Sequence, residues 1–259
     1  MLYSRHALRG FTLVELSVVV VVIALLVGTI LVGQTMIRGS ELQGIITDYT
    51  KYQTAVEDFR KQYKALPGDM IDATDYWGIS TACAGASTTG TCKGDGDALI
   101  DPAAIAGGAG ENYQVWVQLK LAGRITGTYS GAAGSGGASH SVGGTNVPKG
   151  IIKTSAWEVN YLSPTYGGDA TTYANGNYGN YFRFGATTTS GANTAAILKP
   201  DDARKVDDKL DDGRPGTGTI VAGIWDDCTN SATFNVGASD RYLVEAKQPA
   251  CILYFVNQF

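Results

Sequence analysis

One acidic residue, Glu15, lies within an otherwise uncharged apolar run of 22 residues, Phe11 to Val32. A carboxylate inside a segment long enough to cross a bilayer costs free energy and usually has a function. The chemistry it offers is pairing with a cation, since opposite charges attract more strongly in a low dielectric than in water. A basic stretch containing Arg5 and Arg9 precedes the run and ends at Gly10. The pattern predicts a membrane segment with a functional carboxylate near its start.

Carboxylates also gather in two turns of the later chain. They are Asp95, Asp97 and Asp101 in the first turn, and Asp207, Asp208, Asp211 and Asp212 in the second. Several carboxylates beside carbonyl-rich turns form a donor set that suits calcium. The alternative is a solvated turn stabilised by Asx hydrogen bonds. Calcium is therefore the one candidate ligand at either turn, and we expect no other cofactor.

The chain has four cysteines, which allow three pairings. Positive-inside logic places the basic amino-terminal stretch in the cytoplasm and the chain beyond Arg38 across the membrane, in an oxidising compartment. We expect Cys83–Cys92 and Cys228–Cys251, because both pairs close local loops. A metal site is the weaker interpretation, since the sequence contains no C-x-x-C.

Composition and motifs argue against a nucleic-acid binder and against an enzyme. The chain has 20 basic and 24 acidic side chains, net −4; without residues 1–10, which contain Arg5 and Arg9, the counts are 18 and 24, net −6. An acidic product without a long Lys/Arg run does not fit general nucleic-acid binding. The sequence contains no G-x-S-x-G with partners, no H-E-x-x-H and no P-loop. We therefore predict a protein that is not an enzyme.

A long helix must position Glu15. Apolar residues from Leu42 to Tyr63 recur at spacings of three and four, which continues the membrane helix with one apolar face. Pro67 ends the pattern. We predict a leader at 1–10, a helix at 11–66 that crosses the membrane at about 11–33, and a globular domain at 67–259.

The globular domain is predicted to be α+β, with an antiparallel sheet on which the amphipathic half of the long helix packs. Helices are expected at Glu111–Ala122 and Asp201–Leu210, and a long Gly-rich loop at 127–150. The predicted strands are Ile151–Val159, Tyr181–Gly185, Thr219–Trp225, Tyr242–Ala246 and Ile252–Val256.

The amino-terminal residues R-G-F-T-L-V-E, followed at once by a spanning run, resemble the prepilin signature of the type IV pilin and type II secretion pseudopilin superfamily. The resemblance implies cleavage after Gly10 by a prepilin peptidase, which also N-methylates the new amino terminus at Phe11. Glu15 would meet the amino terminus of a neighbouring subunit during filament assembly. A Sec signal peptide and a plain signal anchor are the alternatives, but the first lacks an A-x-A-like cleavage site and the second leaves Glu15 unexplained.

On this resemblance the chain is a structural subunit that polymerises with like pilin subunits through its amino-terminal helix. The alternatives are a minor or tip adhesin, a binding pilin, or a type II secretion pseudopilin. The expected location is a single pass of the inner membrane with the amino terminus in the cytoplasm, and then a periplasmic or extracellular filament.

Overall fold

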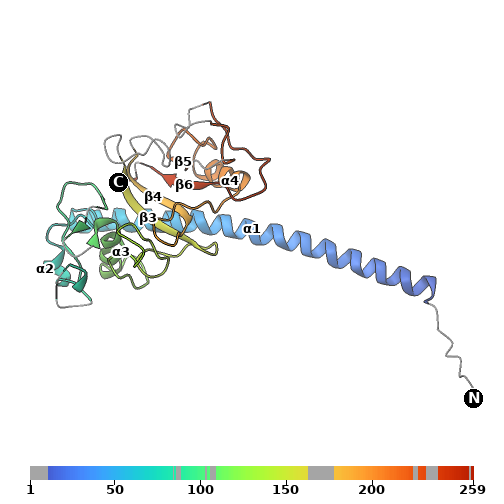
Figure 1. Ribbon diagram of the computed structural model, residues 1–259, viewed down its shortest axis with the longest axis horizontal. Coiled ribbons are helices and arrows are strands. Elements are labelled where there is room, and N and C mark those ends of the chain that lie inside the picture. Colours follow the sequence, from blue (N-terminus) through green and yellow to red (C-terminus); the bar gives the residue numbers. More distant parts are fainter. Residues whose placement is uncertain are drawn as a thin grey trace, which may run out of the picture. The chain divides into compact units, whose positions relative to one another are not determined.

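The computed structural model describes residues 11–83, 85, 89–102, 104–105, 109–162, 178–223, 227–231, 239–256 and 258–259. The chain divides into two compact units, Met1–Glu41 and Leu42–Phe259. One helix, α1 (Leu13–Tyr63), contributes residues to both units. Figure 1 shows the elements in chain order.

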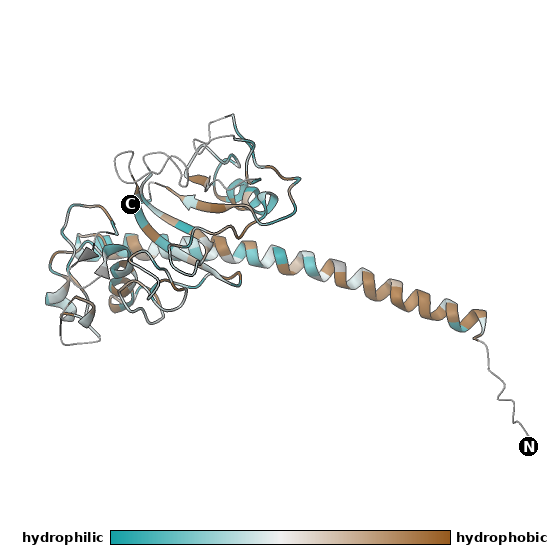
Figure 2. Ribbon diagram, in the orientation of Figure 1, coloured by the Kyte–Doolittle hydropathy of each residue, from teal (hydrophilic) through white to brown (hydrophobic). Residues whose placement is uncertain are grey.

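In the first unit, α1 exposes its apolar side chains. Its amino-terminal stretch is long and apolar enough to cross a membrane, and none of that stretch is buried. In the ribbon of Figure 2, this stretch is coloured almost throughout as hydrophobic, with an interruption near its start. The predicted end of the helix at residue 66 was wrong: α1 stops at Tyr63 because Lys64 adopts a positive φ of 56°.

The second unit contains a four-stranded antiparallel sheet in the order β3-β4-β6-β5. Its strands are β3 (Ser155–Leu162), β4 (Gly179–Ala186), β5 (Ile220–Gly223) and β6 (Ile252–Phe255). An α+β fold with a long amino-terminal helix and an antiparallel sheet is thus confirmed, and it is consistent with a pilin fold.

The strands predicted at Tyr181–Gly185 and Ile252–Val256 match β4 and β6 to within two residues at each end, whereas two other predicted strands differ more. β3 begins at Ser155 rather than Ile151, because the preceding residues form a turn in which Thr154 has a positive φ of 70°. The strand predicted at Tyr242–Ala246 was wrong: Tyr242 makes only an isolated bridge to Thr229, and the chain then turns. The end of the strand predicted at Thr219–Trp225 lies partly outside the described residues.

The part of α1 from Leu42 onward covers one face of the sheet with aromatic contacts. Tyr49 stacks on Phe255 with ring centroids 4.4 Å apart, and Tyr52 meets the ring of Trp157 edge-on at 5.8 Å. Val56 and Phe59 of the same helix face are fully buried. The apolar residues that recur every three or four positions along this half of α1 thus form the buried face that their spacing predicts.

The opposite face of the sheet carries both apolar and polar side chains. Tyr181, Val221, Ile252, Tyr254 and Val256 form a second, smaller apolar cluster. Because side chains alternate along a strand, the polar residues of β3 and β4 that share this face stand beside that cluster.

Among the described residues, four short elements and two longer helices complete the second unit. They are α2 (Ala73–Trp77), a 3-10 turn (Thr81–Cys83), β1 (Ala104–Ile105), β2 (Ala109–Gly110), α3 (Glu111–Leu121) and α4 (Pro200–Leu210). α3 and α4 confirm the two predicted helices to within one residue at each end. The unit also contains two disulfides, Cys83–Cys92 and Cys228–Cys251.

Candidate functional sites

Glu15 lies in the first turn of α1 and binds the residue that precedes the helix. Glu15 Oε2 accepts hydrogen bonds from the Thr12 backbone N–H and from the Thr12 hydroxyl, both at 2.8 Å. The Thr12 hydroxyl in turn accepts a bond from the Glu15 N–H at 3.2 Å. This reciprocal arrangement is a capping box. Sequence reasoning missed it, although the spacing T-x-x-E was there to find.

The capping box gives Glu15 a role inside its own subunit. Both bonds from Thr12 use the same carboxylate oxygen, and the residue is exposed. The helix itself therefore orients the Glu15 carboxylate. The predicted new amino terminus, Phe11, is 91% exposed. Gly10 and the rest of the leader lie outside the described residues.

The first acidic turn is organised around two carboxylates that sequence reasoning missed, Asp69 and Glu111. Asp69 accepts bonds from the N–H groups of Gly96 and Ala98, and Glu111 accepts bonds from those of Asp95 and Asp101. The side chain of Asp95 joins Asp69 and Glu111, with oxygens within 4.8 Å of one another.

Within this turn, Asp97 does not join the group that Asp69, Asp95 and Glu111 form among the described residues. It accepts a bond from the Leu99 N–H at 2.8 Å, while Asp95 accepts one from the Asp97 N–H at 3.2 Å. These are the Asx bonds of a solvated turn. Asp101 contributes its backbone N–H to Glu111 and is likewise outside the carboxylate group.

The second acidic turn brings together Asp207, Asp211 and Asp212, whose oxygens lie within 4.8 Å of one another. Asp207 is fully buried and accepts bonds from the Tyr242 hydroxyl at 2.7 Å and the Gly213 N–H at 3.1 Å. Asp208 instead lies 3.9 Å from Arg204 in an exposed ion pair. Either carboxylate group offers oxygen ligands that suit a hard cation; calcium binding stays a prediction.

Burial shifts two of these carboxyls toward their neutral form. Burial raises the pKa of Glu111 to about 8 and that of Asp207 to about 7, because desolvation penalises the charged carboxylate. Hydrogen bonds from backbone N–H groups oppose this effect in both residues, and the Tyr242 hydroxyl also opposes it at Asp207.

We expect the domain to lose stability as pH rises from about 4.5 to about 7 or 8. In this pH window Glu111 and Asp207 have lost their protons in the unfolded chain but keep them in the folded domain. Each of the two residues therefore lowers the free energy of unfolding by up to about 1.4 kcal/mol per pH unit. Thermal unfolding in a chelating buffer measures the slope. Asp207→Asn should flatten it, whereas the exposed neighbour Asp208→Asn should not. Stability that is constant or rises with pH would contradict the assignment.

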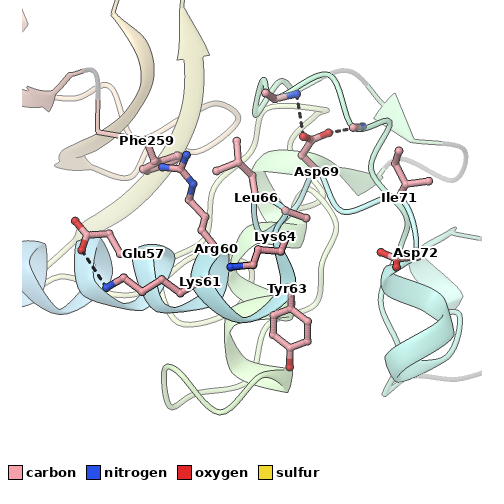
Figure 3. Close-up of a pocket in the computed structure, with 13 residues that line it drawn as sticks. Glu57, Arg60, Lys61, Tyr63, Lys64, Leu66, Asp69, Ile71, Asp72 and Phe259 are labelled. Atoms are coloured by element: carbon pink, nitrogen blue, oxygen red, sulfur yellow. Dashed lines mark hydrogen bonds and ion pairs between the residues drawn. The ribbon is translucent and has the colours of Figure 1, made fainter.

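An open groove of about 1140 Å³ lies at the carboxy-terminal end of α1 (Figure 3). Its charged lining residues are Glu57, Arg60, Lys61, Lys64, Asp69 and Asp72. Lys61 pairs with Glu57 at 3.9 Å, and Asp69 is held by the adjoining turn. Three cationic and three anionic side chains balance one another, so the groove favours no class of charged ligand.

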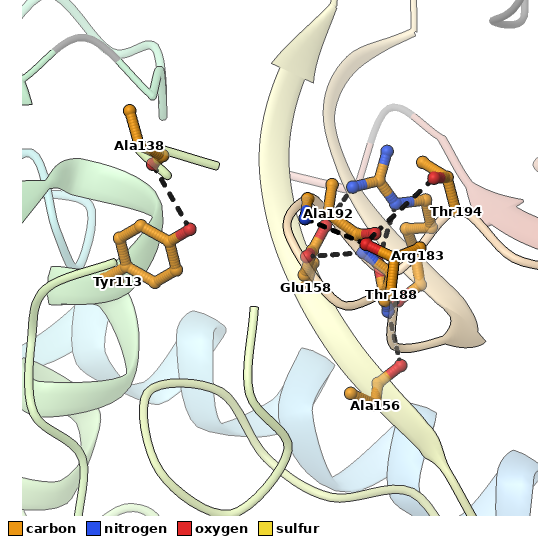
Figure 4. A network of polar contacts seen from close by, with 10 residues as sticks. Tyr113, Ala138, Ala156, Glu158, Arg183, Thr188, Ala192 and Thr194 are labelled. Atoms are coloured by element: carbon orange, nitrogen blue, oxygen red, sulfur yellow. Dashed lines mark hydrogen bonds and ion pairs between the residues drawn. The ribbon is translucent and has the colours of Figure 1, made fainter. Parts of the chain in front are cut away.

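A buried ion pair stands on the sheet face opposite α1. Arg183 and Glu158 face each other across β4 and β3, form a salt bridge, and are 3% and 1% exposed (Figure 4). Asn193 connects them: its side-chain oxygen accepts a bond from Arg183 Nε at 2.8 Å, and its N–H donates to Glu158 Oε1 at 2.9 Å. Burial lowers the pKa of Arg183, but the Glu158 carboxylate, Tyr181 and Tyr254 together outweigh burial, so the pKa is raised.

The long apolar helix and the antiparallel sheet of the α+β unit are consistent with a pilin fold. Residues 5–31 match the family model described as the prokaryotic N-terminal methylation motif. The chain therefore carries a type IV pilin- or pseudopilin-like prepilin segment. No curated protein and no solved structure matches the chain. The motif belongs to a structural rather than a catalytic class of protein, and its apolar helix indicates membrane anchoring.

Proposed function

We propose that this protein is a structural subunit of a type IV pilus-like filament and polymerises through α1. The single observation that carries the proposal is the match at residues 5–31, which includes a capped Glu15 at the start of an exposed apolar helix. In a bundle of such helices, each apolar surface would be buried against its neighbours or against lipid. The partners are like pilin subunits, and the prepilin peptidase acts on the chain beforehand.

The proposed route begins in the inner membrane. Arg5 and Arg9 precede the apolar stretch, which supports a cytoplasmic amino terminus and export of the second unit. Cleavage after Gly10 would create an amine at Phe11, and N-methylation would follow. This amine is the cation that Glu15 of a neighbouring subunit would meet in a medium of low dielectric constant, where neither charge is stable alone.

The intact mass of the protein purified from the cell envelope tests the processing steps. We expect a mass that lacks residues 1–10, gains one methyl group, and is reduced by four hydrogens for the two disulfides. A chain in which Gly10 is replaced by Val should keep its leader and its full mass, and it serves as the reference for failed cleavage. A retained leader in the unaltered protein would contradict the proposal.

A further inference from the structure

The sheet face opposite α1 forms the floor of a cavity of about 370 Å³. In the register of the sheet, Glu158 on β3 lies opposite Arg183 on β4, and Arg183 lies opposite Tyr254 on β6. Asn160 on β3 lies opposite Tyr181 on β4. All of these residues line the cavity, together with Asn112 from the first turn of α3. From this geometry we propose that the cavity binds one neutral sugar unit of a glycan.

Asn112 provides the observation that points to a ligand. Asn112 as a whole is 5% exposed, yet its Oδ1 accepts no hydrogen bond from the part of the chain that the structure describes. A buried carbonyl oxygen without a donor costs roughly 1–3 kcal/mol, so a protein rarely keeps one without a reason. A ligand hydroxyl or N–H in the cavity would supply the missing donor.

The charge of the cavity selects a neutral ligand. Among the described residues that line it, Arg183 and Glu158 are the charged ones, and they form a salt bridge with each other. A charged ligand would have to compete with this pair in a site where desolvation is costly. A neutral molecule with several hydroxyls can instead bond to the polar edges of these side chains without separating them.

Aromatic rings complete the match to a sugar. Tyr181 and Tyr254 line the cavity with ring centroids 5.3 Å apart, next to the amide of Asn160. A pyranose ring has apolar C–H faces and a polar rim of hydroxyls, so it needs aromatic surface and hydrogen-bonding groups side by side. A volume of about 370 Å³ lies at the lower end of the range of about 300–1,000 Å³ for small-molecule pockets, which suits a single ring.

Titration of the full chain with neutral monosaccharides tests the proposal. The protein is purified in a detergent without a sugar headgroup, and glucose, galactose, mannose and N-acetylglucosamine are each followed by saturation-transfer NMR. We expect saturable binding of at least one, with a Kd on the order of 1 mM. No binding at about 50 mM, or binding of glucuronate and glucosamine without any neutral sugar, would overturn it.

Asn112→Leu separates a ligand-binding role from a structural one. It should weaken sugar binding at least tenfold while leaving the melting temperature of the sugar-free protein unchanged or higher, since it removes an unsatisfied buried acceptor. Asn146→Leu is the matched control, because Asn146 is buried with both side-chain groups bonded and should be needed for stability. A loss of stability in Asn112→Leu with unchanged sugar binding would overturn the proposal. These measurements do not depend on filament assembly.

Discussion

Glu15→Gln should abolish incorporation of the protein into filaments while leaving α1 intact. Glutamine can replace glutamate in a capping box, so the bonds from Thr12 are kept and only the negative charge is lost. Without that charge, the amine of a neighbouring subunit would be buried unpaired in a low dielectric, at a cost of several kcal/mol. The measurement is the amount of the variant in sheared filaments relative to the amount in the membrane.

Thr12→Val is the control that separates charge from capping. It removes the hydroxyl that bonds Glu15 but keeps the carboxylate, and loss of such a cap typically costs about 1 kcal/mol of helix stability. We expect this variant to be processed and to enter filaments. Normal incorporation of Glu15→Gln, or exclusion of both variants, would contradict an assembly role for the charge of Glu15.

Arg183→Met should be the most destabilising single change considered for the second unit. It leaves the buried Glu158 without its cation, and removal of one partner from a buried ion pair costs about 3–5 kcal/mol. The double variant with Glu158→Leu should be more stable than Arg183→Met alone, because no uncompensated charge remains. Chemical denaturation of the unaltered protein, of Arg183→Met, of Glu158→Leu and of the double variant measures the coupling between the two sites.

An exposed ion pair provides the comparison for that experiment. Lys205 lies 2.6 Å from Asp201 on α4, and both side chains are at least 40% exposed. Lys205→Met should cost less than about 1 kcal/mol, since solvent screens the pair. A cost for Arg183→Met as small as that for Lys205→Met would contradict the expected coupling.

Local sequence patterns predicted the helices better than the strands. The spacing of apolar residues from Leu42 to Tyr63 is set by one helix face and is visible without knowledge of its partner. The segment Tyr242–Ala246 has strand-like composition, but a strand also needs an edge with which to pair. Here Leu243 N–H instead bonds the carbonyl of Cys228, and the chain turns. Residue composition alone does not show whether a segment has a neighbouring strand with which to pair.

The polar sites depended even more on tertiary structure. Glu158 and Arg183 meet only because β3 and β4 pair in one register, and residues 25 positions apart leave no local signal of that pairing. Glu111 similarly meets Asp95 only through the path of the intervening chain. The capping box at Thr12 and Glu15 is different, because its three-residue spacing is readable directly from the sequence.

The strand order has a consequence for how the protein is made. Although β6 is the last strand of the sheet along the chain, it lies between β4 and β5 and bonds to both. A polypeptide that emerges from its amino terminus cannot close this sheet until residues 252–255 have been delivered. If the amino-terminal helix is inserted in the membrane first, β4 and β5 are translocated before β6. Until β6 arrives, the strand edges that it pairs with stay exposed. Biogenesis would then depend on protection of these edges, for example by a chaperone, until translocation of the chain is complete.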